Sequence, residues 1–273
     1  MTRFERDSTE TARLRELRHA WLEAAGGAVI VHANDYPNAY AVKAHRHGRA
    51  QLLHARSGVV LVKTGLGHWM VPAGHAIWIP AGIMHAVDML GGVSMLSAYV
   101  KPQALDGLPR DLRVVAMTPL MRGLLTEAAS LDFEAPADAR AALILDLVLH
   151  EIPRLAEMPL GLPFPADERM AALCRDYLAA PRPDVTIDGW AGRLGMSRRT
   201  FTRRFQRETG VSLSLWRQQA SLFAALPKLA AGEAVTNVAL DLGYESVAAF
   251  TTMFRRMLGS PPRSYLSANL AAE

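Results

Sequence analysis

The strongest constraint on the fold of this chain is a pattern that occurs twice near its C-terminus. The segments WAGRLGMSRRTFTRRFQRETG (190–210) and VALDLGYESVAAFTTMFRRMLG (238–259) each contain an alanine, then Leu-Gly, then two phenylalanines four residues apart, then a closing glycine. A small alanine lets two helices cross closely, a glycine permits the turn, and phenylalanines at i and i+4 share one helix face. Each segment is therefore predicted to be a helix-turn-helix, whose second helix enters the major groove of DNA.

The two copies lie 48 residues apart in register, and each has a serine where its second helix begins. Ser197 and Ser246 are placed to cap these helices, since a serine hydroxyl accepts a hydrogen bond from an N–H group that the first turn leaves unpaired. A single helix corner of this kind occurs in many packed helical proteins, whereas two copies in register are specific. The duplication therefore favours DNA binding over a general helical bundle.

The second helix of each copy is expected to read DNA with the face opposite its phenylalanines, at about 100° per residue. Arg199 and Arg203 are expected to make paired hydrogen bonds to guanine, whereas Ala248 and Thr252 have shorter reach, so the second motif is expected mainly to position the protein. A phosphate contact is the alternative role of any single arginine. The predicted DNA contacts are Ser197, Arg198, Arg199, Thr202, Arg203, Gln206, Arg207, Ala248, Thr251, Thr252, Arg255 and Arg256.

Basic charge is concentrated in the same region. Residues 1–165 carry 16 basic and 16 acidic side chains, whereas residues 166–273 carry 14 and 10. Seven arginines and a single acid, Glu208, lie within residues 190–217. Such a cluster is typical of a protein with a polyanionic partner, although on its own it also fits a solvated helix face.

These segments, together with VTNVALDLGYES and FRRMLGSPPRSYL, resemble the AraC/XylS family of transcription regulators, which are typically bacterial. The resemblance covers residues 168–267 and implies helix-turn-helix motifs at 187–208 and 235–258, joined by a long helix. It also implies that the partner is double-stranded promoter or operator DNA. Pro227 departs from the family pattern, because a proline inside the joining helix removes a backbone donor and is expected to kink or end it.

The first part of the chain has a different pattern. Its short apolar runs are separated by glycines and prolines, which predicts a small antiparallel barrel or sandwich over residues 28–105. Residues 106–157 are predicted to be a helical region with a broad apolar face, which packs on the barrel or on another copy and serves dimerisation.

Prolines mark the boundary between these regions and the C-terminal domain. Four prolines between residues 153 and 165 predict a linker at 158–167. Residues 1–27 are expected to be an extension, either helical or frayed. The predicted fold is thus α+β and multidomain: an N-terminal cupin-like β-barrel with helices, followed by an all-α double helix-turn-helix domain.

Histidines mark a candidate pocket in the predicted barrel. His45 and His47 are two residues apart on an expected strand, so their imidazoles point to one face, and Gln51 returns to that face. The segment GHAIWIPAGIMHAVDM matches the second cupin motif, G-x5-P-x-G-x2-H, which ends on His85. HRHGRAQLLHARSG resembles the first cupin motif, with Gln51 where a glutamate is usual. Residues 28–100 therefore resemble a cupin barrel, which is a known partner of this type of DNA-binding domain.

In a cupin, these positions converge on a divalent metal, so the resemblance implies a pocket formed by His45, His47, Gln51 and His85. Gln51 offers an oxygen without charge, and the three imidazoles suit zinc, nickel, copper or iron. The alternatives are direct contact with an organic effector, a satisfied polar cluster in a small cavity, and histidines that reach solvent. No cofactor is expected to be required.

Together these patterns predict a one-component transcription regulator and not an enzyme. A small-molecule effector in the cupin domain is expected to shift the arrangement of a homodimer, and an activator also contacts RNA polymerase. A single cysteine, a charged N-terminus and the lack of a membrane-spanning run indicate a cytoplasmic protein without membrane contact. Two rivals remain: a metal-dependent cupin oxygenase or isomerase with an accessory helical domain, and a regulator whose cupin only dimerises.

Overall fold

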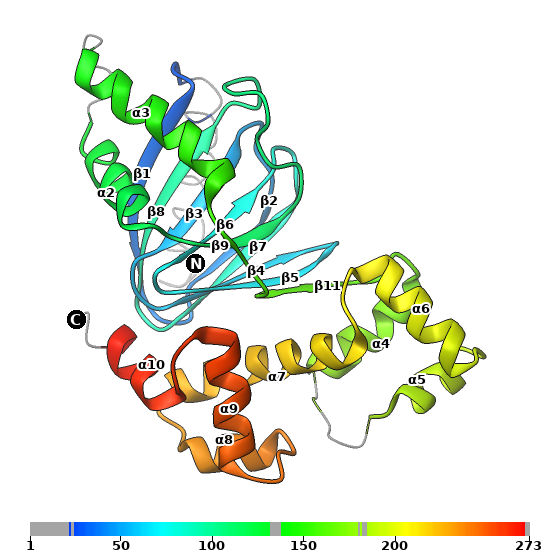
Figure 1. The fold of residues 1–273 in the computed structure, drawn as a ribbon. Helices are drawn as coiled ribbons and strands as arrows, with labels where there is room; N and C mark the ends of the chain where they lie inside the picture. Colours follow the sequence, from blue (N-terminus) through cyan, green and yellow to red (C-terminus); the bar gives the residue numbers. More distant parts are fainter. Residues whose placement is uncertain (1–21, 23–24, 132–137, 180, 182–184, 271–273) are drawn as a thin grey trace, which may run out of the picture.

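The computed structural model describes residue 22 and residues 25–131, 138–179, 181 and 185–270. Within these ranges the chain forms a β-rich N-terminal part and a helical C-terminal part (Figure 1). The predicted α+β multidomain fold is confirmed. Most of the extension expected at residues 1–27 lies outside the described residues.

The β-rich part consists of two antiparallel sheets that face each other (Figure 1). One sheet has the strand order β1-β8-β3-β6-β9-β10, and the other has the order β11-β5-β4-β7-β2. The strands are β1 (Val29–Tyr36), β2 (Ala41–His45), β3 (Ala50–Ala55), β4 (Val59–Thr64), β5 (Gly67–Pro72), β6 (His75–Ile79), β7 (His85–Leu90), β8 (Val93–Val100), β9 (Arg113–Ala116), β10 (Glu157–Met158) and β11 (Gly161–Pro163).

Alternation along the strands divides their side chains between two environments. On β3, Gln51 and Leu53 line a cavity inside the barrel, whereas Leu52 belongs to a second core on the outer face of the six-stranded sheet. The helices α2 (Pro119–Ala128) and α3 (Ala139–Glu151), followed by the 3-10 turn Ile152–Arg154, cover that outer face (Figure 1). Strand β9 also lies in the region that was expected to be helical throughout, because its apolar residues continue the sheet beside β6.

The proline-rich segment expected to be a linker at 158–167 instead adds a strand to each sheet. β10 pairs with β9, and β11 pairs with β5. A proline is tolerated on an edge strand, where its missing N–H faces away from the ladder. Leu160 and Leu162 are fully buried, and Gly161 leaves room for an indole, since an added Cβ would lie 2.8 Å from Nε1 of Trp69. We call residues 157–163 the strap.

The C-terminal part contains the two predicted helix-turn-helix motifs. Gly195 and Gly243 turn the chain between the helices of each motif with φ of 67° and 75°, a region of backbone conformation that favours glycine. The helices are α4 (Glu168–Ala179), α5 (Ile187–Arg193), α6 (Arg198–Thr209), α7 (Leu213–Ala230), α8 (Val235–Asp241), α9 (Val247–Leu258) and α10 (Pro262–Leu270). None of the helices in the described ranges combines the length and the hydrophobicity that a membrane crossing requires.

Helix α7 joins the two motifs and lies between them (Figure 1). Of the two expected effects of Pro227, a kink or an end, the end does not occur, because the helix continues to Ala230. Pro227 stands in the last turn, so its missing N–H removes one hydrogen bond from a helix that is about to end. The expectation that the joining helix ends at this proline is therefore wrong, and the expectation of a kink stays a prediction.

Aromatic packing holds the first motif together. The phenylalanines Phe201 and Phe205 are at most 1% exposed and contact Trp190, and Phe205 also contacts Trp216 of α7. On α4, Cys174 is buried in the same hydrophobic cluster, and burial raises the pKa of its thiol well above the ordinary value.

Candidate DNA-binding surface and ligand pocket

Helix α6 begins with a side-chain cap and exposes one polar face. The Ser197 hydroxyl accepts a hydrogen bond from the Thr200 N–H at 3.2 Å, which places this predicted contact residue at the start of the helix. Arg199, Arg203 and Gln206 are exposed, and no hydrogen bond or ion pair within the described residues engages their side chains. Thr202 is half-buried beside them. We call Arg199, Thr202, Arg203 and Gln206 the reading face of α6. This face is thus accessible to DNA.

The other arginines of α6 have partners. Arg198 donates to Asp188 of α5 at 3.1 Å, and water screens this exposed pair. Arg207 lies 3.7 Å from the half-buried Glu208, beyond hydrogen-bond distance. These two predicted phosphate contacts flank the reading face and remain exposed.

The side chain of Arg204 points toward the rest of the domain and away from the exposed side of α6. Its guanidinium lies 2.7 Å from the Asp167 carboxylate and 2.8 Å from that of Glu208, and the Asp167 N–H donates to Glu208. The hydrogen bond from Arg204 holds the pKa of the Glu208 carboxyl below its usual range. This triad fastens α6 to the start of α4, so Arg204 has a structural role.

Helix α9 has the same arrangement as α6, a capping serine and an exposed face, but with different side chains. Ser246 caps it by accepting the Ala249 N–H at 3.1 Å. At the positions of the reading face, Ala248, Thr252 and Arg255 are exposed and Thr251 is half-buried. Arg256 is exposed as well, and donates to Gln218 of α7. The second face therefore offers short side chains and arginines near its C-terminal end.

The barrel encloses a cavity of about 520 Å³ between its two sheets. One end carries the histidines, and the remaining wall combines apolar and aromatic side chains with the polar residues Asn34, Asp35 and Ser97. The lining residues include Tyr36, Tyr40, Val42, His45, His47, Gln51, Leu53, His85, Val87, Met89, Met95, Ser97 and Tyr99. A cavity of this size, with a few polar groups at one end, is typical of a site for a small molecule.

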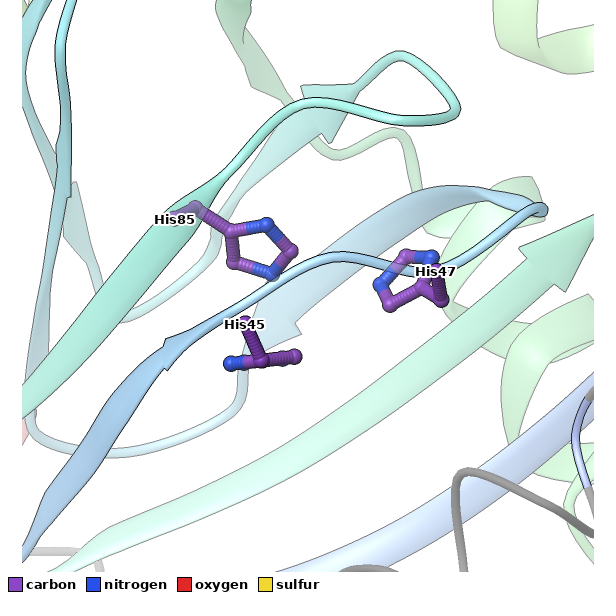
Figure 2. A group of neighbouring side chains, drawn as sticks. All are labelled: His45, His47 and His85. Carbon is purple, nitrogen blue, oxygen red and sulfur yellow. The ribbon is translucent and has the colours of Figure 1, made fainter.

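The structure brings the three predicted histidines together, as Figure 2 shows. One ring nitrogen from each of His45, His47 and His85 lies within 4.8 Å of the others. His45 ends β2 and His85 begins β7, opposite it in the ladder, but His47 lies beyond the end of β2. The expectation that both early histidines share one strand is therefore wrong; a loop turns His47 toward the same point.

Backbone carbonyls select the tautomer of these imidazoles. Nδ1 of His45 lies 2.9 Å from the carbonyl of Lys43, and Nδ1 of His85 lies 2.8 Å from that of Ile83. Nδ1 of His47 likewise faces the carbonyl of Arg49. Because a carbonyl only accepts, each Nδ1 carries a proton, and Nε2 is the atom left to bind a ligand. Histidines that bind metals are commonly held in this way.

Gln51 lies beside this cluster, as predicted for its position. Its side-chain oxygen is 3.2 Å from Nε2 of His47, and its nitrogen is 3.0 Å from the Ser97 hydroxyl and 3.4 Å from that of Tyr99. Because Nε2 of His47 carries no proton when Nδ1 donates to a carbonyl, this pair is satisfied with the amide turned over, so that its nitrogen donates to Nε2 and its oxygen accepts from the two hydroxyls. An amide at this position orients His47 without adding charge to the pocket.

Arg49 is a structural residue of the pocket that the sequence did not reveal. It is only 3% exposed, and its guanidinium donates to the carbonyls of Leu22, Ala25, Gly26 and Gly27 at 2.6–3.3 Å. Leu22 in turn lines the cavity. Arg49 therefore holds the segment before β1 against the barrel. No pattern in the sequence identifies this role, because the partners of Arg49 are backbone carbonyls of a segment more than twenty residues away.

Comparison with known proteins supports both the ligand-binding barrel and the helix-turn-helix domain. A model of the AraC-like ligand binding domain matches residues 26–154, and a helix-turn-helix domain model matches residues 190–268. The HTH-type transcriptional regulator NimR of Escherichia coli K12 is 30% identical over 223 residues, which cover 82% of this chain and 81% of NimR.

Two solved structures are also similar. ToxT of Vibrio cholerae with a bound unsaturated fatty acid is 13% identical, with a TM-score of 0.38 over 91% of this chain and 98% of ToxT. The DNA-binding domain of AdpA, in complex with a target DNA, is 32% identical, with a TM-score of 0.35 over 40% of this chain and 95% of that domain.

A ligand-binding barrel followed by two helix-turn-helix motifs defines a DNA-binding transcription regulator with a sensor domain. This chain belongs to the AraC/XylS family of such regulators.

Proposed function

We propose that this regulator responds to a small-molecule effector bound in the barrel cavity. The observation that carries the proposal is the cavity itself, which has three converging imidazoles at one end and an apolar wall that includes Leu53, Val87 and Met89. Such a site suits a compact, largely apolar molecule with one polar head group. The effector acts by binding one arrangement of the regulator better than another.

We infer that the first motif selects the DNA sequence and the second mainly anchors the protein. Arg203→Ala is expected to weaken binding to the specific site by about 1–3 kcal/mol and to relax base preference in one part of the site. Thr252→Ala, the same position in the second motif, is expected to cost less. Both variants are titrated on the specific duplex and on a scrambled duplex at one salt concentration.

A third variant separates reading from anchoring. Arg255→Ala is expected to weaken binding to both duplexes alike, because a phosphate contact carries no sequence information. A larger loss of the specificity ratio in Thr252→Ala than in Arg203→Ala contradicts the assignment of reader and anchor.

The histidine end of the cavity is proposed to hold the effector head group, either directly or through a transition metal. The residues fit a metal, because His45, His47 and His85 each present Nε2 while Nδ1 is held by a carbonyl. Zinc, nickel, copper or iron is suited to imidazole ligands, and such an ion would polarise the head group.

Metal analysis distinguishes the two forms of this proposal. Protein purified without nickel resin is incubated with each metal, desalted and measured by elemental analysis. About one equivalent of metal supports the metal form, whereas less than about a tenth supports direct contact. Gln51→Glu is the informative variant, since a carboxylate beside the imidazoles is expected to raise metal affinity by at least about tenfold.

We further propose that the regulator is a homodimer held together through α3. Val148 and Leu149 of this helix pack on the barrel, but Leu143 is 70% exposed and Leu147, one turn later, is 41% exposed. Leucines at i and i+4 form a stripe that a second copy of the helix covers.

Introducing a charge into this apolar stripe tests the dimer. Leu143→Arg is expected to raise the dimer dissociation constant by at least about thirtyfold, the effect typical of a central interface residue. Leu240→Arg is the matched control, because Leu240 is also exposed, at 60%, but lies on α8. Sedimentation equilibrium gives both constants. Dissociation by the Leu240 variant alone would move the interface to the DNA-binding domain.

We place this activity in the cytoplasm, where a DNA-binding regulator of a bacterial promoter works, and an activator of this kind also contacts RNA polymerase.

The rival function is a metal-dependent cupin oxygenase or isomerase. It predicts turnover at the histidine site, and the duplicated helix-turn-helix motif has no role in it.

A further inference from the structure

The histidine end of the cavity offers hydrogen-bond acceptors, and this decides which head groups it can hold directly. Since Nδ1 of His45, His47 and His85 carries the proton and faces a backbone carbonyl, Nε2 of each neutral ring presents a lone pair. Gln51 adds a carbonyl oxygen when its amide is turned toward His47. A head group that binds here without a metal therefore has to supply several N–H or O–H donors.

The spacing of the imidazoles suits three hydrogen bonds to one ammonium nitrogen. One ring nitrogen from each histidine lies within 4.8 Å of the others (Figure 2). A nitrogen that donates three hydrogen bonds of about 2.9 Å at tetrahedral angles separates its three acceptors by about 4.7 Å. A primary ammonium group has three such donors. It therefore fits the three imidazoles, or two of them and the oxygen of Gln51.

The charge of the cavity wall favours a cationic ligand over an anionic one. Among the described residues that line the cavity, none is a lysine or an arginine, and the single carboxylate is that of the exposed Asp35. Proteins that bind a carboxylate or a phosphate commonly meet it with a guanidinium or an ammonium group. An acid placed beside the imidazole lone pairs would have no such partner among these residues, whereas an ammonium ion is complementary to them.

The length of the cavity sets the size of the rest of the ligand. At the end away from the histidines, Tyr36 and Tyr40 line the wall with ring centroids 5.2 Å apart. The carbonyl of Tyr40 accepts from the N–H of Met89, and Met89 lies four residues after His85 on β7. At about 3.3 Å per residue, the two ends are about 13 Å apart. An apolar body of about eight carbon atoms, aliphatic or aromatic, fits between them.

We propose that the ligand of this cavity is a primary amine, held as its ammonium ion by the three histidines, with an apolar body that extends toward Tyr36 and Tyr40. The inference rests on the proposed effector site and takes its direct form, without a metal. Burial of an ammonium ion costs hydration free energy, which three charge-assisted hydrogen bonds offset. The aromatic face of Tyr99, which lines the same cavity, adds a cation–π attraction.

Matched probes test the head group on the wild-type protein. Octyl, cyclohexylethyl and phenylethyl skeletons each carry an ammonium, a carboxylate or a hydroxyl group. Isothermal titration calorimetry with the full-length protein, in the presence of EDTA, measures each dissociation constant. The amine of at least one skeleton is expected to bind at least about tenfold more tightly than the matching acid and alcohol.

The other outcomes separate this inference from the proposed function. A smaller preference, or a preference for the acid or the alcohol, overturns the amine and leaves an effector site in place. Binding that appears only when zinc replaces EDTA overturns direct capture of an amine and supports the metal form of the site. Binding of none of the probes overturns the amine and contradicts the proposed effector site as well.

Two variants test where the ammonium group lies. His45→Phe removes one acceptor but keeps a ring, and is expected to reduce the preference for the amine over the alcohol by at least about tenfold. His68→Phe is the control, because His68 is also half-buried in the five-stranded sheet but does not line the cavity. Asp35→Asn is expected to reduce the preference by less than about threefold, since its carboxylate is exposed. An amine preference that survives His45→Phe but disappears in Asp35→Asn overturns the placement among the histidines. If His45→Phe fails to fold, the wild-type probe series alone decides.

DNA binding then reports whether the bound amine acts as an effector. Fluorescence anisotropy with a labelled specific duplex is measured with and without the amine that binds most tightly. The amine is expected to change the affinity for this duplex by at least about fivefold in the wild type and by less than about twofold in His45→Phe at the same concentration. An amine that binds in the cavity without this change supports the ligand assignment and contradicts only the effector function.

Discussion

A fourfold increase in salt, from about 50 to about 200 mM, is expected to weaken DNA binding by this regulator by about a hundredfold. Six exposed arginines are placed to contact phosphates or bases: Arg198, Arg199, Arg203, Arg207, Arg255 and Arg256. Each phosphate contact releases counterions and contributes about −0.9 to the slope of log affinity against log salt, so the four arginines assigned to phosphates, which are Arg198, Arg207, Arg255 and Arg256, give a slope of about −3.6. Fluorescence anisotropy with a labelled duplex at several salt concentrations measures this slope.

Two neighbouring arginines supply the control. Arg207→Ala is expected to reduce the slope by about 0.9, since this side chain is exposed and only weakly paired. Arg204→Ala is expected to leave the slope unchanged, because its guanidinium is held by Asp167 and Glu208. Binding that stays flat across this range of salt would contradict the electrostatic interface altogether.

Phe205→Ala is expected to lower the free energy of unfolding of the DNA-binding domain by about 3–5 kcal/mol. The ring is 1% exposed and lies among Phe201, Trp190 and Trp216, with ring centroids 5.7–6.4 Å apart. Its removal leaves a cavity that rigid aromatic neighbours cannot fill. Urea denaturation followed by tryptophan fluorescence measures the change, since two of these neighbours are tryptophans.

Two further substitutions calibrate this result. Phe254→Ala, at the matching position of the second motif, is fully buried and is expected to cost a similar amount. Leu240→Ala removes an exposed side chain and is expected to change stability by no more than about 0.5 kcal/mol. A loss below 1 kcal/mol for Phe205→Ala would mean that this aromatic core is not tightly packed.

The helix-turn-helix motifs were predictable because their determinants are local. A capping serine, a glycine in the turn and two phenylalanines four residues apart fix a helix pair within about twenty residues, and the pattern occurs twice. The histidine site was predictable in composition for a similar reason. Its geometry was not, since His47 reaches the pocket through a loop whose path depends on the packing of both sheets.

The strap was missed because prolines were taken as evidence against regular structure. Pro159 and Pro163 are compatible with edge positions, and the alternation of Leu160, Gly161 and Leu162 is itself a strand pattern. Nothing in that short segment specifies which sheet edges are open to it. Arg49 was missed on similar grounds, because only the fold reveals that four carbonyls surround its guanidinium.

Cys174 has a practical consequence for experiments on this chain. It is the only cysteine of the sequence, and burial keeps its thiol both protonated and covered. A maleimide or spin-label reagent therefore reacts with any new surface cysteine in preference to the native one. Fluorophore pairs for distance measurements between the barrel and the DNA-binding domain need no prior removal of native thiols, so the natural sequence serves directly as the parent for single-molecule work.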